Sequence, residues 1–100
     1  MALYAKSMNL VEAEQIVLSE LAKPSISNGI EVGLLKEKTI EKYWGWIFFY
    51  QSLAFIKSGD FLEMLGGNAP IMINKCTGEL IHTGTAYDVE HYIKEYEGSL

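Results

Sequence analysis

The stretch Tyr43–Gln51 reads Tyr-Trp-Gly-Trp-Ile-Phe-Phe-Tyr-Gln, is dense in aromatic side chains and decides the fold. Aromatic and β-branched side chains fit a pleated surface, whereas a helix of this composition would carry bulky rings on every side. We therefore predict a strand. With a period of two, one face carries Trp44, Trp46, Phe48 and Tyr50, and the other carries Tyr43, Ile47 and Phe49. Both faces are apolar, so this strand is covered on both sides or presents one aromatic face to a partner.

The bulk composition bounds the class of protein. A chain of 100 residues predicts one domain, residues 1–100, with a single core. Its formal charge of −5 argues against nucleic-acid binding, which requires clustered lysine and arginine, and fits a basic protein partner better.

Cysteine and hydropathy patterns bound the compartment. The lone cysteine, Cys76, excludes an internal disulfide, and the sequence has no Cys-x-x-Cys or His-rich cluster for a metal, so we expect no cofactor. The first nine residues carry no charged segment followed by a long apolar run, and no apolar stretch approaches membrane-spanning length. We expect a cytoplasmic protein that does not interact with a membrane.

Elements before the aromatic stretch follow from caps and periodicity. After a short irregular start, Asn9 and Glu12 predict a capping box that opens an amphipathic helix, which Pro24 ends. The inward stripe of this helix is expected to be Leu10, Ala13, Val17 and Leu21. A first strand is predicted over Ile30–Leu35, and Lys36–Lys42 is expected to be a charged connection.

Elements after the aromatic stretch are shorter. Periodicity leaves Leu53–Ile56 open between a strand and a helical turn, and Phe61–Leu65 reads as a short helical or irregular segment under the core. After the break at residues 66–70, an antiparallel hairpin is predicted from Ile71–Lys75 and Glu79–Thr83, with Gly78 in a left-handed turn position.

The last element is predicted to be a helix over Ala86–Glu97, with Thr85 as N-cap and Asp88 completing a capping box. The fold class is therefore α+β: a small antiparallel sheet of about four strands, with an N-terminal and a C-terminal helix packed on one face.

Several short motifs resemble the immunity protein 35 (YrhB-like) family between Tyr43 and Tyr96. The motifs are Gly45-Trp46-Ile47-Phe48-Phe49-Tyr50, Gly59-Asp60, Gly67-Asn68-Ala69-Pro70-Ile71 leading into Lys75–Gly78, Gly84-Thr85 and Tyr92-Ile93. The resemblance implies a small cytoplasmic α+β protein that protects bacteria from their own toxins, with a branch that looks like a stress-related chaperone. It also implies an acidic residue after the apolar strand, where this chain has Asn74. It points to a binder and not to a catalyst.

Catalytic constellations are sparse. Nucleophilic catalysis needs a cysteine or serine beside an oriented histidine, but Cys76 is expected at an exposed hairpin tip with His82 several residues away on the returning strand. His91 shares a helix surface with Asp88 and Glu95, which indicates a solvated polar face or a pH-sensitive contact. We expect no enzymatic activity.

The leading hypothesis is an immunity protein that binds a cognate bacterial toxin or peptidase domain and occludes it. Acidic side chains would steer a basic toxin, which could be a cysteine peptidase, and an aromatic patch would form the desolvated centre. The residues expected to contact the partner are Glu41, Tyr43, Trp44, Asp60, Glu63, Asp88, His91 and Glu95. The alternatives are a chaperone-like holdase and a homodimerisation module, each using an exposed apolar sheet face.

Overall fold

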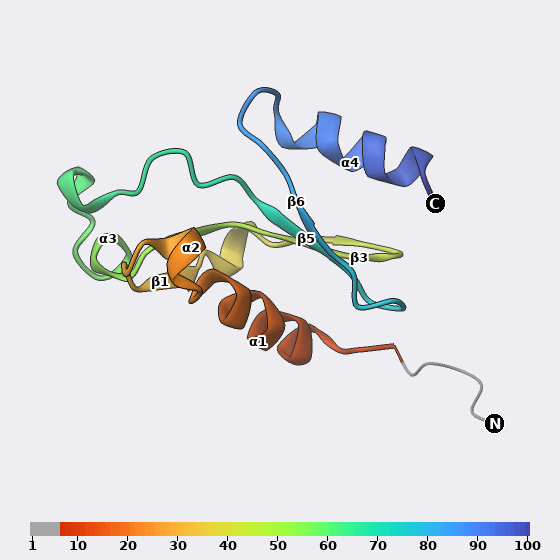
Figure 1. The fold of residues 1–100 in the computed structure, drawn as a ribbon, viewed down its shortest axis with the longest axis horizontal. Helices are drawn as coiled ribbons and strands as arrows, with labels where there is room; N and C mark the ends of the chain where they lie inside the picture. Colours follow the sequence, from red (N-terminus) through yellow and green to blue (C-terminus); the bar gives the residue numbers. More distant parts are fainter. Residues whose placement is uncertain (1–6) are drawn as a thin grey trace.

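The computed structural model describes residues 7–100, apart from the side chain of Ser27, so the first six residues of the expected irregular start lie outside it. The fold is α+β, as predicted (Figure 1). The helices are α1 (Leu10–Leu21), α2 (Pro24–Ser27), α3 (Leu53–Ser58) and α4 (Val89–Gly98), with 3-10 turns η1 (Lys36–Lys38) and η2 (Phe61–Glu63). The strands are β1 (Val32–Leu34), β2 (Ile40–Lys42), β3 (Gly45–Phe48), β4 (Tyr50–Ser52), β5 (Ile71–Asn74) and β6 (Leu80–His82).

The strands form an antiparallel four-stranded sheet in the order β2-β3-β5-β6 and a separate antiparallel pair, β1-β4. The aromatic stretch supplies both, because β3 belongs to the larger sheet and β4 to the pair. The single strand predicted over Tyr43–Gln51 is therefore wrong in extent: Tyr43 and Trp44 form the turn before β3, and Phe49 separates β3 from β4. The carbonyl of Phe49 accepts a hydrogen bond from the Leu35 N–H at 2.8 Å. At Phe49 the backbone is therefore already hydrogen-bonded to the residue that follows β1.

Strand β2 occupies Ile40–Lys42, the end of the charged connection expected over Lys36–Lys42, so that prediction is wrong for these three residues. Glu41 faces Trp46 across the ladder, and Lys42 faces Gly45 at the turn. Short edge strands tolerate charged residues because one side of the strand is open to water. Charge therefore concealed this strand in the sequence.

The two long helices cover opposite faces of the larger sheet, so the prediction that both pack on one face is wrong (Figure 1). On one face, α1 buries Ala13, Val17 and Leu21 against Trp46, Phe48, Ile71 and Ile73. On the other, Ile93 of α4 packs with Trp44, Ile47 and Met72. Strands of three or four residues make a sheet small enough for one helix to cover each face, and the strands are apolar on both faces to match.

The helix starts are set by caps. Asn9 and Glu12 form the predicted capping box of α1. The predicted start of the last helix is wrong, because Asp88 itself is the N-cap of α4, accepting a hydrogen bond from the His91 N–H at 3.1 Å. Leu53–Ile56, left open by the sequence, belongs to α3, which Ser52 caps. The β5–β6 hairpin is confirmed, with Gly78 at a left-handed φ of 76°.

Candidate functional site

The sequence-predicted contact residues lie in three separate places. Glu41 and Tyr43 lie at the β2–β3 turn, Asp60 caps η2 and Glu63 ends it. Asp88 caps α4, and His91 and Glu95 lie on that helix. Because β3 runs from that turn toward β4 and α3, the first two groups lie at opposite ends of β3. These residues do not form one surface.

Trp44 is not an exposed contact residue. Its side chain is only 3% exposed, and its indole N–H donates to a Glu97 carboxylate oxygen at 3.0 Å. Its ring meets the Tyr96 ring edge-on, with centroids 4.7 Å apart. Trp44 therefore anchors α4 on the sheet, whereas the neighbouring Tyr43 is 77% exposed.

Five exposed apolar side chains lie on or near α3 and η2, and we call them the apolar end: Ile30, Ile56, Phe61, Leu62 and Met64. Phe61 is 79% exposed and Leu62 is 92% exposed. The expectation that this segment lies under the core is therefore wrong for both residues. Exposed apolar groups gathered in this way mark surfaces that bind other molecules.

Two buried polar side chains hold this segment in place. Gln51, 4% exposed, accepts a hydrogen bond from the Leu65 N–H at 2.8 Å and donates to the Leu65 carbonyl at 3.1 Å. Ser52, 3% exposed, donates to the Glu63 carbonyl and accepts from the Phe55 N–H. These hydrogen bonds hold the end of η2 and the residues after it, although the apolar side chains of Phe61 and Leu62 face water.

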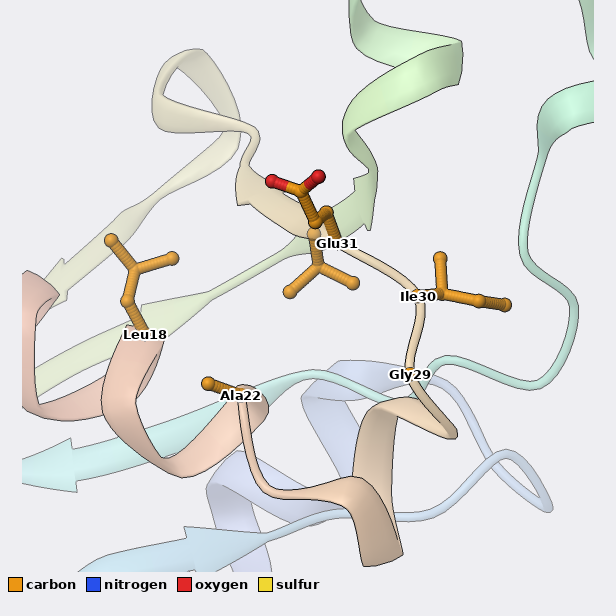
Figure 2. A pocket seen from close by; sticks show the side chains of 6 residues that line it. Leu18, Ala22, Gly29, Ile30 and Glu31 are labelled. Carbon is orange, nitrogen blue, oxygen red and sulfur yellow. The ribbon is translucent and has the colours of Figure 1, made fainter.

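Two hollows adjoin the apolar end. Figure 2 shows the first, of about 310 Å³, with Leu18 of α1 and its C-cap Ala22 on one side and the segment of Gly29, Ile30 and Glu31 on the other. The second, of about 610 Å³, reaches Leu62 and Met64. Ile30 and Glu31 line both hollows, so a grooved surface runs from the end of α1 to η2.

Acidic side chains outnumber basic ones at the rim of the apolar end. Glu31, Asp60 and Glu63 lie beside it, with Lys57 on α3 and Lys38 of η1 as neighbouring cations. Asp60 also has a structural role, because its carboxylate accepts the Leu62 N–H at 2.9 Å and so caps η2. Acidic side chains around an apolar centre favour encounter with a basic surface.

The α4 surface is aromatic and acidic. The rings of Tyr87 and His91 stack with centroids 4.1 Å apart, and His91 Nε2 lies 3.8 Å from a Glu95 carboxylate oxygen. Asp88 is engaged in capping the helix. The three predicted residues of α4 therefore do share one surface.

The candidate nucleophile and histidine are not paired. Cys76 is exposed in the turn after β5, as expected, whereas His82 ends β6 and its Nε2 lies 2.8 Å from a Glu20 carboxylate oxygen on α1. Within residues 7–100, no group of three or more His, Cys, Asp or Glu side chains is arranged to hold a metal ion. No helix in that part of the chain is long and apolar enough to cross a membrane.

A rigid α+β scaffold with an exposed, acid-rimmed apolar end has the features of a protein that binds another protein. The chain belongs to the immunity protein 35 family, whose model matches residues 12–95. It is also 42% identical over 53 residues to the uncharacterized protein YrhB of Escherichia coli (strain K12), a match covering 53% of this chain and 56% of that protein. The chain thus spans about half the length of this relative. No solved structure matches this chain significantly. The resemblance found in the sequence is confirmed, and the family suggests a role in toxin immunity.

Proposed function

We propose that this protein is a non-catalytic cytoplasmic inhibitor that binds a cognate bacterial toxin domain through its apolar end and covers the active site or substrate entry of that toxin. Family membership supports the toxin as partner. The observation that carries the choice of surface is the exposure of Phe61 and Leu62 on a segment fixed by Gln51 and Ser52.

Burial of these side chains supplies the affinity. Covering Phe61 and Leu62 stabilises a complex by roughly 1.5–3 kcal/mol each. Because buried side chains already hold the segment, little conformational entropy is lost on binding. The toxin that fits carries an apolar cleft with a basic rim, and a cysteine peptidase with such a cleft is one form it takes.

The test is co-expression with candidate toxin domains, beginning with any that is encoded beside this gene. Wild-type protein should rescue growth and form a stoichiometric complex, whereas Leu62→Asp should abolish rescue and weaken binding at least about 30-fold, the loss expected of a hot-spot residue. Tyr43→Asp is the matched control, because Tyr43 is also exposed but lies at the far end of β3. Equal losses in both variants, or none in Leu62→Asp, would refute this choice of surface.

The other readings of the same surface have separate outcomes. Rescue without a complex, together with suppression of aggregation of unrelated proteins, would indicate a holdase. A concentration-dependent dimer that Leu62→Asp dissociates would indicate a dimerisation module.

Salt dependence tests the acidic rim. Raising the salt concentration from about 0.05 M to 0.5 M should lower the association rate of the complex and leave its dissociation rate nearly unchanged, because rim charges act mainly on encounter. Stopped-flow fluorescence measures both rates. Glu31→Gln with Glu63→Gln should reduce the slope, and an unchanged slope in this double variant would contradict a role for the rim.

A further inference from the structure

The two edges of the larger sheet differ in chemistry. One edge is β2, which carries Glu41 and Lys42, and the other is β6, which reads Leu80-Ile81-His82. Charged residues on an edge strand discourage pairing with another chain. Strand β6 has no lysine, no proline and no acidic residue, so its edge lacks this protection.

The backbone of β6 has hydrogen-bonding groups directed to this edge. The Asn74 N–H donates to the Glu79 carbonyl at 2.9 Å, and the Thr83 N–H donates to the Pro70 carbonyl at 3.3 Å, so the backbone of Glu79 and Thr83 faces β5. Successive residues of an antiparallel strand alternate in this direction. The N–H and C=O groups of Leu80 and His82 therefore point away from β5, toward the open edge.

A hollow of about 460 Å³ lies beside the same strand, between β6 and α4. Met72 and Ile81 from the sheet and the rings of Tyr92 and Tyr96 from α4 supply its apolar lining. Glu95 also lines it, and no lysine does. The Tyr96 hydroxyl donates to a Glu79 carboxylate oxygen at 3.1 Å, which places a second acidic group next to this lining.

We propose that the β6 edge binds an extended segment of a partner protein as an additional strand of the sheet. Main-chain bonds to Leu80 and His82 provide affinity, and alternate side chains provide specificity, as in other cases of strand addition. An apolar side chain of the segment occupies the hollow. Two residues along, on the same face, a lysine or arginine pairs with Glu95. This site is separate from the apolar end and does not require the partner to be a toxin.

The test uses heptapeptides selected from a random phage-displayed library on the folded full chain. The selected peptides should share an apolar residue followed at the second position by lysine or arginine. In ¹⁵N-labelled protein, a synthetic peptide of this kind should slow amide exchange at Leu80 and His82 at least tenfold. Glu95→Gln should weaken its binding at least threefold.

Leu80→Pro removes an edge-directed N–H without touching the ladder to β5, and proline is tolerated at such edge positions. It should weaken peptide binding at least tenfold. Glu41→Pro is the matched control. The Lys75 N–H donates to the Trp44 carbonyl at 2.8 Å, so the backbone of Trp44 and of Trp46 faces β5, and Glu41, which lies opposite Trp46, directs its N–H to the β2 edge. This variant should bind the peptide normally.

A second probe does not depend on the variants folding. Methylation of the peptide amides that face β6 should abolish binding, and methylation of the alternate amides should not. The proposal is overturned if no peptide is selected, if the exchange changes map to the apolar end, or if both methylated peptides bind alike. Concentration-dependent protection of Leu80 and His82 without peptide would instead assign the edge to a second copy of the chain.

Discussion

Gly45 occupies a position where a side chain has no room. A Cβ atom there would lie 1.9 Å from the carbonyl oxygen of Ile73, on the neighbouring strand of the buried β3–β5 pair. Because that oxygen belongs to the backbone, it can move only by disturbing the ladder. Gly45→Ala should therefore lower the free energy of unfolding by about 3 kcal/mol, measured by urea denaturation. Gly66→Ala, where a Cβ would meet open space, should change it by less than about 0.5 kcal/mol, and similar losses in both variants would contradict this account.

The turn at Tyr43 and Trp44, just before Gly45, explains why the faces of the aromatic stretch could be predicted only in part. Trp46 and Phe48 share one face, as a period of two requires, and Ile47 lies on the other. Trp44 packs on the same face as Ile47 and not on the face of Trp46, because the turn before Gly45 interrupts the alternation of side chains between the two faces. Composition indicated a strand correctly. A two-residue turn inside an aromatic run, however, does not alter the hydrophobic pattern of the sequence and so could not be predicted from it.

At the scale of elements, Glu20 joins α1 to β6. Its carboxylate oxygens lie 2.7 Å from Lys23 Nζ and 2.8 Å from His82 Nε2. Hydrogen bonds from Lys23 and then from His82 hold the pKa of Glu20 below its ordinary value of 4.5. A carboxyl group whose pKa is lower in the folded state contributes stability above its unfolded pKa, and this contribution is lost as the pH falls through the folded pKa.

Glu20→Gln should therefore be less stable than wild type near neutral pH, and the difference should shrink as the pH falls below about 4.5, the ordinary pKa of this carboxyl. Urea midpoints of both proteins across the acid range measure it. Glu90→Gln, on the first turn of α4, controls for loss of a surface charge. A difference between Glu20→Gln and wild type that stays constant through the acid range would show that the carboxylate does not titrate as inferred.

The elements differ in how far the sequence determines them. Asn9 and Glu12 form a capping box within four consecutive residues, so the start of α1 was predictable from local sequence. The start of α4 was not, because both Thr85 and Asp88 are acceptable N-caps. The choice between them involves tertiary packing: the Tyr92 hydroxyl lies 2.7 Å from where a Gly84 Cβ would be, so the preceding loop lies against the helix.

At the scale of the whole molecule, the fold class and family were predictable, but the candidate site was not. An apolar run such as Phe61–Leu65 has the same pattern whether it is buried or exposed. Its exposure is fixed by hydrogen bonds between the Gln51 side chain and the backbone of Leu65, 14 residues further along the chain, and from Ser52 to the carbonyl of Glu63, 11 residues further along. The predicted acidic residues beside η2, Asp60 and Glu63, do lie at the rim of the apolar end.

The placement of α1 and α4 on opposite faces makes a prediction about additivity. Val17 and Ile93 are both fully buried, but Val17 packs in the cluster with Trp46 and Ile93 in the cluster with Ile47. Val17→Ala should cost roughly 1.6 kcal/mol from two lost methyl groups, and Ile93→Val about 1 kcal/mol. Because the sheet separates the two sites, the double variant should show the sum of these costs to within about 0.5 kcal/mol.

The matched comparison pairs Val17→Ala with Ile73→Val, which lies in the same cluster. These two substitutions both remove methyl groups from one shared core, so their costs in unfolding free energy should depart from additivity by more than about 0.5 kcal/mol. Chemical denaturation of the single and double variants gives both coupling energies. Coupling between Val17 and Ile93 as large as that between Val17 and Ile73 would mean that the two helices share a core, which an arrangement on opposite faces does not allow.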